Sequence, residues 1–236
     1  MPVGIFYLAI AVLAIISLSV GVYTDVKSRE INSLLFIPLL VAAVAYNIYI
    51  GFSILYVALE TAIFLSLFLV PDSLAFIALG IIYLVLSAVL SIAVSPYMGF
   101  QSLISSLIYI MGYRERLFGI GDIKAIISTL FATPFLESAI PGTLFLSYLP
   151  VSIQYLFAIS VSSMVFIAAA SFVLKRNASA FGLGGSFVIE HDERFQAAVK
   201  NKYAVIERSG KKFLSYRIPF MVPILAGYIL LIFGLI

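Results

Sequence analysis

The sequence predicts an all-α polytopic membrane protein, a helical bundle of about eight spans (six to eight). Three observations predict this class. Hydrophobic residues make up 63% of the 236 residues and charged residues only 11%, whereas charged residues form roughly a quarter of an ordinary soluble domain. The apolar residues form long runs, broken by Gly, Pro and short polar turns. All 14 Lys and Arg fall into four places along the chain.

The apolar runs give the expected spans, since about 20 apolar residues cross the hydrocarbon core. These are the ranges 2–24, 33–51, 53–70, 74–95, 97–113, 119–137, 153–174 and 217–236. A tight turn near Gly51 separates the second from the third, and Pro134 interrupts the sixth. The fifth is short and mildly amphipathic, so it either crosses the membrane or lies in the interface. The first is too long for a cleaved signal sequence, so we expect it to be retained.

The basic residues predict the orientation of the chain. Their four places are Lys27 with Arg29, then Arg114, Arg116 and Lys124, then the 175–212 segment, and finally Arg217. With eight spans all four places lie on one side, which the positive-inside rule makes the cytoplasmic side. If the fifth segment did not cross, the later basic residues would lie outside. The requirement that all basic places lie on the cytoplasmic side therefore favours eight spans and an external N-terminus.

The chain divides into three expected parts. Residues 1–174 form a transmembrane bundle, 175–216 a basic cytoplasmic loop, and 217–236 the last transmembrane helix. The loop carries eight basic and four acidic residues. Its start is rich in Gly and Ser, and its later part is expected to form a short helix or a hairpin. It is either a solvated loop attracted to anionic headgroups or an element that contacts the substrate.

Missing residue types exclude several kinds of chemistry. There is no Cys, which excludes disulfides, thiolate metal sites and a thiol nucleophile. The only His, His191, follows GLGGSF at 182–187, but no partner for a serine protease is evident, and HDER is not a zinc-protease motif. We therefore expect no metal and no cofactor. The sequence pI of about 9.0 fits basic cytoplasmic loops rather than nucleic-acid binding.

Two aspartates stand at the expected cytoplasmic ends of spans. Asp25 ends the first span in GVYTDVKSREINSL, and Asp122 begins the sixth in FGIGDIKAI. They share one depth if those two helices are neighbours, and ionisable groups in a membrane are functional hypotheses by default. Gly119 and Gly121 lack Cβ atoms, so another backbone can approach closely there and the local backbone can leave helical geometry. An extended peptide substrate needs that access.

A pair of close carboxyl groups predicts aspartic-protease chemistry. Two carboxyl groups a few ångströms apart cannot both ionise easily, and they titrate as a unit. The ionised member can take a proton from water while the protonated member hydrogen-bonds a peptide carbonyl. Spacing alone leaves a second interpretation open, in which each aspartate merely pairs with Lys27, Arg29 or Lys124. Lys124 itself either extends to the interface or tunes the acids electrostatically.

The segments around the two aspartates resemble motifs of a known family. GIGDIK at 119–124 matches the G-x-G-D-x-K pattern of the GxGD membrane aspartyl proteases. DVKSREINS at 25–33 resembles the first-aspartate motif of type IV prepilin peptidases, and the pairing of the two is more specific than either alone. The chain is most similar to the archaeal prepilin and preflagellin peptidases, which process class III signal peptides. The motifs cover only these two segments, while the multi-span architecture extends the likeness loosely.

The resemblance implies a protease of the plasma membrane. Such an enzyme cleaves the basic leader from pilin-like or archaellin precursors at the cytoplasmic face, so those precursors and the lipid bilayer are its expected partners. Carried over by position, Asp25 and Asp122 are the catalytic pair, and Gly119 and Gly121 shape the site. The zinc element of bacterial members is absent with the cysteines, so methyl transfer is unsupported. The 26–121 segment is longer than expected for the archaeal form, which fits an extra pair of spans.

Glu60 supports an alternative function. It lies mid-span in LYVALETAIFL, where it is either protonated or hydrogen-bonded, or else relays protons or binds an ion. With Asp25 and Asp122 it would serve a small ion-coupled transporter, although a transporter needs its acids near mid-bilayer. A non-catalytic membrane scaffold is a third class. Asp72 is expected to start a helix and Glu137 to be a solvated acid on the outer face.

Overall fold

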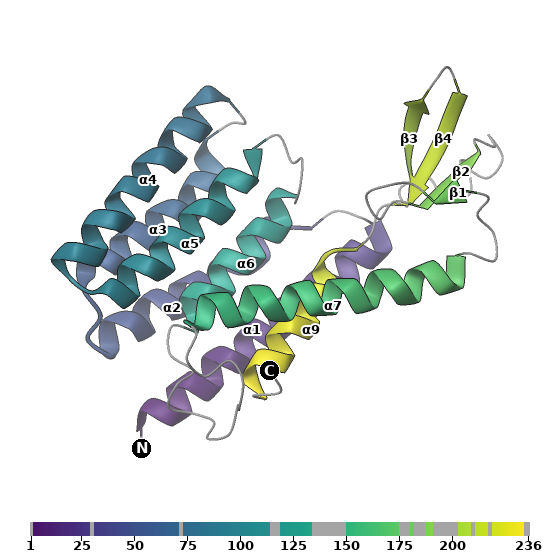
Figure 1. The fold of residues 1–236 in the computed structure, drawn as a ribbon. Coiled ribbons are helices and arrows are strands. Elements are labelled where there is room, and N and C mark those ends of the chain that lie inside the picture. The colour runs from purple at the N-terminus through teal and green to yellow at the C-terminus, as the bar shows by residue number, and fades with distance from the viewer. Residues whose placement is uncertain are drawn as a thin grey trace.

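The computed structural model describes residues 2–28, 31–70, 73–113, 119–133, 150–174, 180–181, 187–190, 203–208, 211–216 and 219–233. Within these residues there are eight α-helices, one short 3-10 helix and a four-stranded sheet (Figure 1). Several residues singled out above lie outside the described ranges: Arg29, Asp72, Arg114, Arg116, Pro134, Glu137, His191, Arg217 and the glycine-rich 182–186.

The expected spans in the first half of the chain form helices close to the predicted bounds. They are α1 (Pro2–Ser28), the 3-10 helix η1 (Ser33–Phe36), α2 (Ile37–Tyr49), α3 (Ile54–Leu69), α4 (Leu74–Ala93) and α5 (Pro96–Met111). The side chains of Asn32 and Ser53 cap η1 and α3 by accepting backbone N–H groups. Gly51, with φ 85°, makes the expected turn between α2 and α3.

The second half contributes three helices, of which α6 is shorter than predicted. They are α6 (Ile120–Ala132), α7 (Val151–Leu174) and α9 (Met221–Ile232). At the end of α6, Asn47 Nδ2 donates to the carbonyl of Phe131 at 2.9 Å and Gln101 Nε2 to that of Leu130 at 2.8 Å. The last carbonyls of a helix have no intrahelical partner, and a bilayer offers them no water. The two amides therefore let α6 end within the bundle.

Helix α6 occupies the centre of the bundle. It contacts α1, α2, α3, α5, α7 and α9, and every residue from Asp122 to Ala132 is buried. Its polar residues, among them Asp122, Ser128 and Thr129, are therefore buried as well and must find partners inside the bundle. This central position brings the start of α6 next to segments that are far away in the sequence.

Helix α5, the segment whose crossing was left open, follows the bundle axis. It lies beside α4 and α3 (Figure 1). A Cβ on Gly99 of α5 would overlap the backbone of Ser91 in α4, so the close approach of these helices requires a glycine. Because α4 returns the chain, α3 and α5 run in the same direction.

The 175–216 segment contains the sheet. Its strands are β1 (Ala180–Phe181), β2 (Phe187–Glu190), β3 (Tyr203–Arg208) and β4 (Lys211–Tyr216), all antiparallel in the order β1-β2-β4-β3. Of the two expected forms of its later part, the hairpin is the one found, between β3 and β4. The sheet lies beyond the end of α7, outside the helical bundle (Figure 1).

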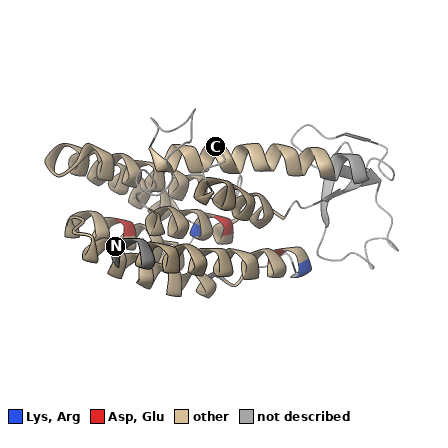
Figure 2. Cartoon of the chain, turned by 90° about the horizontal axis from the view of Figure 1, so that it is seen from below, with Lys and Arg blue, Asp and Glu red and all other residues tan. Residues whose placement is uncertain are grey.

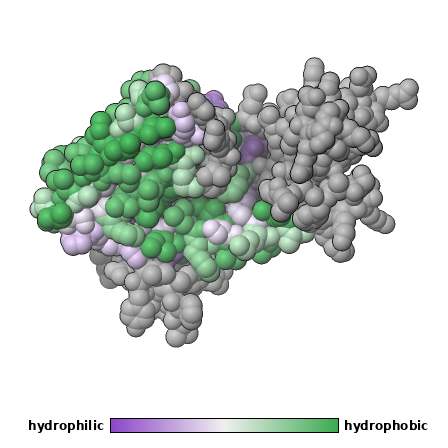
Figure 3. Space-filling model, turned by 45° about the horizontal axis from the view of Figure 1, so that its top comes forward, coloured by the Kyte–Doolittle hydropathy of each residue, from purple (hydrophilic) through white to green (hydrophobic). Residues whose placement is uncertain are grey.

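The exterior of the bundle is apolar. Three described helical segments have the length and composition to cross a membrane, namely Phe6–Lys27, Leu74–Ala93 and Val151–Ala169. Others are apolar but shorter: Leu34–Tyr49, Ile54–Leu69 and Met221–Ile232. Hydrophobic side chains cover most of the bundle surface in Figure 3, and charged residues are sparse among the described helices in Figure 2. Such a surface suits lipid, so this is a helical membrane-associated protein.

Candidate active site

Asp25 lies within α1 and is held by the last helix. Asp25 was predicted to end the first span, and because α1 continues to Ser28 it lies inside the last turn of the helix. Its side chain is only 7% exposed, and its Oδ2 accepts the backbone N–H of Met221 at 3.2 Å. Met221 is the first residue of α9, where N–H groups have no intrahelical partner and carry the positive end of the helix dipole. The start of α9 therefore stabilises this carboxylate.

The approach of α1 to α9 depends on a glycine. A Cβ on Gly21 would overlap the side chain of Met221, one turn of α1 before Asp25. Gly21 is buried and so is Met221, whose side chain fills this space. Neither Gly21 nor Met221 was expected at the site, because the amide that contacts Asp25 is a backbone group and leaves no mark on the sequence.

Asp122 lies in the first turn of α6 and accepts a hydrogen bond from the residue that precedes the helix. Its side chain is 9% exposed, and its Oδ2 accepts the backbone N–H of Gly119 at 3.2 Å. Gly119 has extended backbone angles, φ −66° and ψ 151°, so the chain leaves helical geometry there as expected. An acid in the first turn is stabilised by the helix dipole. The two aspartates therefore have the same kind of donor.

The two motifs meet at Gly121. A Cβ on Gly121 would lie 2.9 Å from Cβ of Ile31, which follows Asp25 by six residues. The close approach expected at this glycine is thus made by the segment that enters η1. Helices α1, α6 and α9 also contact one another. The structure therefore brings both aspartate segments to one end of the bundle.

The two described lysines near the aspartates contact aromatic rings. Lys27 is exposed, and its Nζ lies 3.4 Å from the hydroxyl of Tyr23. Lys124 is only 5% exposed, and its Nζ lies 3.5 Å from the ring centroid of Phe68 in α3, a cation–π contact. Neither lysine forms an ion pair with Asp25 or Asp122. Lys124 is thus buried against the end of α3, and its two roles, at the interface or in tuning the acids, stay predictions.

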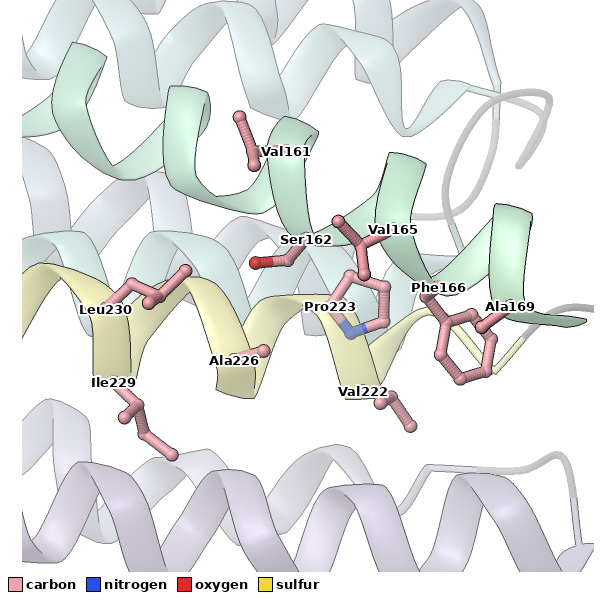
Figure 4. Close-up of a pocket in the computed structure, with 10 residues that line it drawn as sticks. All are labelled: Val161, Ser162, Val165, Phe166, Ala169, Val222, Pro223, Ala226, Ile229 and Leu230. Carbon is pink, nitrogen blue, oxygen red and sulfur yellow. The ribbon is translucent and has the colours of Figure 1, made fainter. Parts of the chain in front are cut away.

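A hydrophobic groove runs between α7 and α9 (Figure 4). Its volume is about 510 Å³, and Ser162 is the one polar residue among those that line it. Val222 and Pro223 of α9 line it, and they directly follow Met221, the residue whose amide contacts Asp25. The groove thus begins next to the candidate site.

Glu60 does not join the aspartates. It lies in the middle of α3, is fully buried, and has Ser102 and Ser105 of α5 as neighbours. The three acids of the transporter hypothesis therefore do not form one cluster. Within the described residues, no three His, Cys, Asp or Glu side chains are grouped as a metal site would require. Comparisons with protein-family models, curated proteins and solved structures find no match.

Proposed function

We propose that the protein is an aspartic endopeptidase of the plasma membrane, with Asp25 and Asp122 as its catalytic pair. It cleaves the basic leader of pilin-like or archaellin precursors at the cytoplasmic face. One observation carries the proposal: two buried aspartates occupy one end of the bundle, and each accepts an N–H from the start of a helix. The likeness of 25–33 and 119–124 to the GxGD motifs gives the substrate class.

The reaction requires only the two carboxyl groups and water. The ionised carboxyl takes a proton from water, whose oxygen then bonds to the scissile carbonyl carbon. The other carboxyl gives its proton to the carbonyl oxygen, which forms a tetrahedral diol. Collapse of the diol breaks the C–N bond while a proton passes to the leaving nitrogen. The N–H groups of Met221 and Gly119 hold the aspartates in place through these steps.

The proposed orientation follows from the ends of three helices. Asp25 lies near the end of α1, Asp122 at the start of α6, and the Asp25 partner at the start of α9. The basic sheet segment precedes α9 directly, so the positive-inside rule assigns this end to the cytoplasm. Eight crossings of the membrane satisfy this arrangement.

The groove between α7 and α9 is the proposed place for the hydrophobic segment of the precursor. A pilin-like segment is apolar, and the lining of the groove is apolar except for Ser162. Because Val222 and Pro223 adjoin Met221, a helix lying in the groove would end beside Asp25. The peptide that follows toward the leader would then reach the two carboxyl groups.

Co-expression with a candidate precursor tests the proposal. Asp25→Asn and Asp122→Asn should each abolish the faster-migrating cleaved product on a gel, while the amount of enzyme in the membrane persists. Asp72→Asn, the same change in an aspartate outside both motifs, is the matched control and should leave cleavage intact. Ordinary cleavage by either of the first two variants would remove that aspartate from the catalytic pair. If solute transport and not proteolysis depended on them, the transporter hypothesis would be correct.

A further inference from the structure

Glu60 is a buried acid that peptidase chemistry does not use. Its side chain is 0% exposed in the middle of α3. Neither of its carboxyl oxygens has a hydrogen-bond partner among the described residues. An ionised carboxylate is very costly inside a membrane protein unless something compensates its charge. The surroundings of Glu60 should therefore show what that compensating group is.

Two serines of α5 lie beside the carboxyl group and have uncommitted hydroxyls. Ser102 and Ser105 are both fully buried and lie within hydrogen-bonding range of the Glu60 carboxyl group, although among the described residues no contact of either Oγ has full hydrogen-bond geometry. Buried serines in helices usually donate to the carbonyl four residues earlier. Ser87 and Ser106 of the same bundle do so. Ser102 and Ser105 do not, although they are equally buried, so their hydroxyls are directed to the Glu60 carboxyl group rather than to their own helix.

A third hydroxyl lies on the same face of α3. Tyr56 stands one helical turn before Glu60, is buried, and interacts electrostatically with it. Its hydroxyl has no hydrogen-bond partner within the described residues either. The four oxygen atoms beside one another are therefore the two of the Glu60 carboxyl group and the hydroxyl oxygens of Ser102 and Ser105, with Tyr56 one turn away.

We propose that Glu60, Ser102 and Ser105 form a binding site for a sodium ion between α3 and α5. The available atoms are all oxygens, which are the ligands of hard cations rather than of zinc or copper. One carboxylate balances one positive charge, so a divalent ion would leave an uncompensated charge in the bundle. A proton on Glu60 would supply a single donor, whereas a cation engages the carboxylate and hydroxyl oxygens together.

No described basic side chain is close enough to neutralise the carboxylate of Glu60 in place of the ion. Lys124 is the buried lysine of the bundle, and its Nζ lies over Phe68. Phe68 is two helical turns beyond Glu60, a distance of about 12 Å along α3. The lysine is therefore too far away to neutralise the carboxylate by direct contact. A bound sodium ion would also tie α3 to α5, so it should stabilise the fold.

The stability of the purified full-length protein in sodium chloride tests this site. Melting temperature is measured in detergent while NaCl replaces choline chloride at constant total chloride, with KCl as a parallel series. The wild-type protein should show a saturable rise in melting temperature with sodium. Potassium should give a smaller rise at the same concentration. Binding of radioactive sodium to the same sample should saturate at one ion per chain.

Variants assign the effect to these residues. Glu60→Gln should lose the sodium-dependent rise, and it should not be less stable than the wild type in choline. Ser102→Ala and Ser105→Ala should each need at least tenfold more sodium for half of the rise. Ser87→Ala is the matched control, since that buried serine already donates within its own helix, and its sodium response should equal that of the wild type.

Two results would overturn the proposal. One is a wild-type melting temperature that is the same in sodium, potassium and choline chloride. That result would mean that no sodium ion binds and that a proton neutralises Glu60. The other is an unchanged sodium response in Glu60→Gln. If Glu60→Gln does not fold, the serine variants decide, because a response equal to that of Ser87→Ala would exclude the site. Cleavage of the precursor is a separate readout, so these results do not depend on the peptidase.

Discussion

The aspartates at the helix ends and Glu60 inside the bundle show two ways to bury a carboxyl group in a membrane protein. Asp25 and Asp122 each accept an N–H from the first turn or cap of a helix. Glu60 receives no backbone N–H from the described residues, and its polar neighbours are the hydroxyls of Ser102 and Ser105. Amides at a helix start are free to donate, whereas those in mid-helix already bond to the preceding turn. An acid near a helix start can therefore be held by the backbone, but an acid elsewhere needs other side chains or an ion.

Changing the length of the acidic side chains should separate the aspartates at the helix ends from Glu60 most strongly, with the effect measured as precursor cleavage. Asp25→Glu and Asp122→Glu keep the charge but displace the carboxyl group from its N–H donor. A misplacement of about 1 Å can cost about 100-fold in rate, so we expect at least that loss of precursor cleavage. Glu60→Asp should leave cleavage unchanged and weaken sodium stabilisation. Rates of leader removal by purified protein measure the first effect, and a fully active Asp122→Glu would show that the carboxyl position is not critical.

The glycines of the second motif should differ in their tolerance of a methyl group. Gly121→Ala places Cβ 2.9 Å from Cβ of Ile31, so the two motifs must move apart and cleavage should fall about tenfold or more. Gly119→Ala should also lower cleavage, because its Cβ would lie 3.3 Å from Asp122 Oδ2, but it does not touch Ile31. Ile31→Ala should restore part of the rate lost in Gly121→Ala and none of the rate lost in Gly119→Ala. The same response of both alanine variants to Ile31→Ala would contradict a close contact between the motifs.

Substitutions at the opposite end of α6 should lower the stability of the protein rather than its rate of cleavage. Asn47→Leu removes the amide that donates to the Phe131 carbonyl, and Gln101→Leu leaves the Leu130 carbonyl with only the N–H of Thr133 at 3.3 Å. Each change should lower the free energy of unfolding by about 1–3 kcal/mol. Ser160→Ala, which removes an exposed bond within one helix, is the control. Denaturation in mild detergent measures the loss, and values no larger than that of Ser160→Ala would exclude this role.

Lys124→Met should have the smallest effect on stability. The variant decides whether Lys124 only packs against Phe68 or also tunes the aspartates electrostatically. Loss of the cation–π contact with Phe68 should reduce the free energy of unfolding by about 0.5–2 kcal/mol. If the lysine only packs against the ring, the pH dependence of cleavage stays as in the wild type. A shifted pH profile at unchanged stability would show instead that Lys124 tunes the aspartates. Lys27→Gln, at an exposed lysine, serves as the control for charge alone.

The helices could be located from the sequence because their boundaries have local causes. Asn32 and Ser53 cap helices, Gly51 turns the chain, and apolar runs fix the lengths. The aspartate segments could also be located, since the chain has only 11 Asp and Glu and both Asp25 and Asp122 fall at the ends of apolar runs. What remained open was the form of the 175–216 segment, because its strands are short and lie among polar residues.

Contacts between helices could not be predicted, because the helices are apolar on most sides and their rotation leaves little trace in the sequence. The burial of Lys124 depends on Phe68 of α3, and the end of α6 depends on Asn47 and Gln101 of other helices. The pairing of Glu60 with serines of α5 likewise requires knowing that α3 and α5 are neighbours. A single sequence does not contain that information.

The hydrogen bond between Met221 and Asp25 joins residues that are 196 positions apart. During synthesis Asp25 leaves the ribosome long before Met221, so the growing chain carries one aspartate without its amide donor. The proposed enzyme then acquires its working geometry only when α9 has inserted beside α1. Insertion of α9 would thus be the step that puts the amide donor of Asp25 in place.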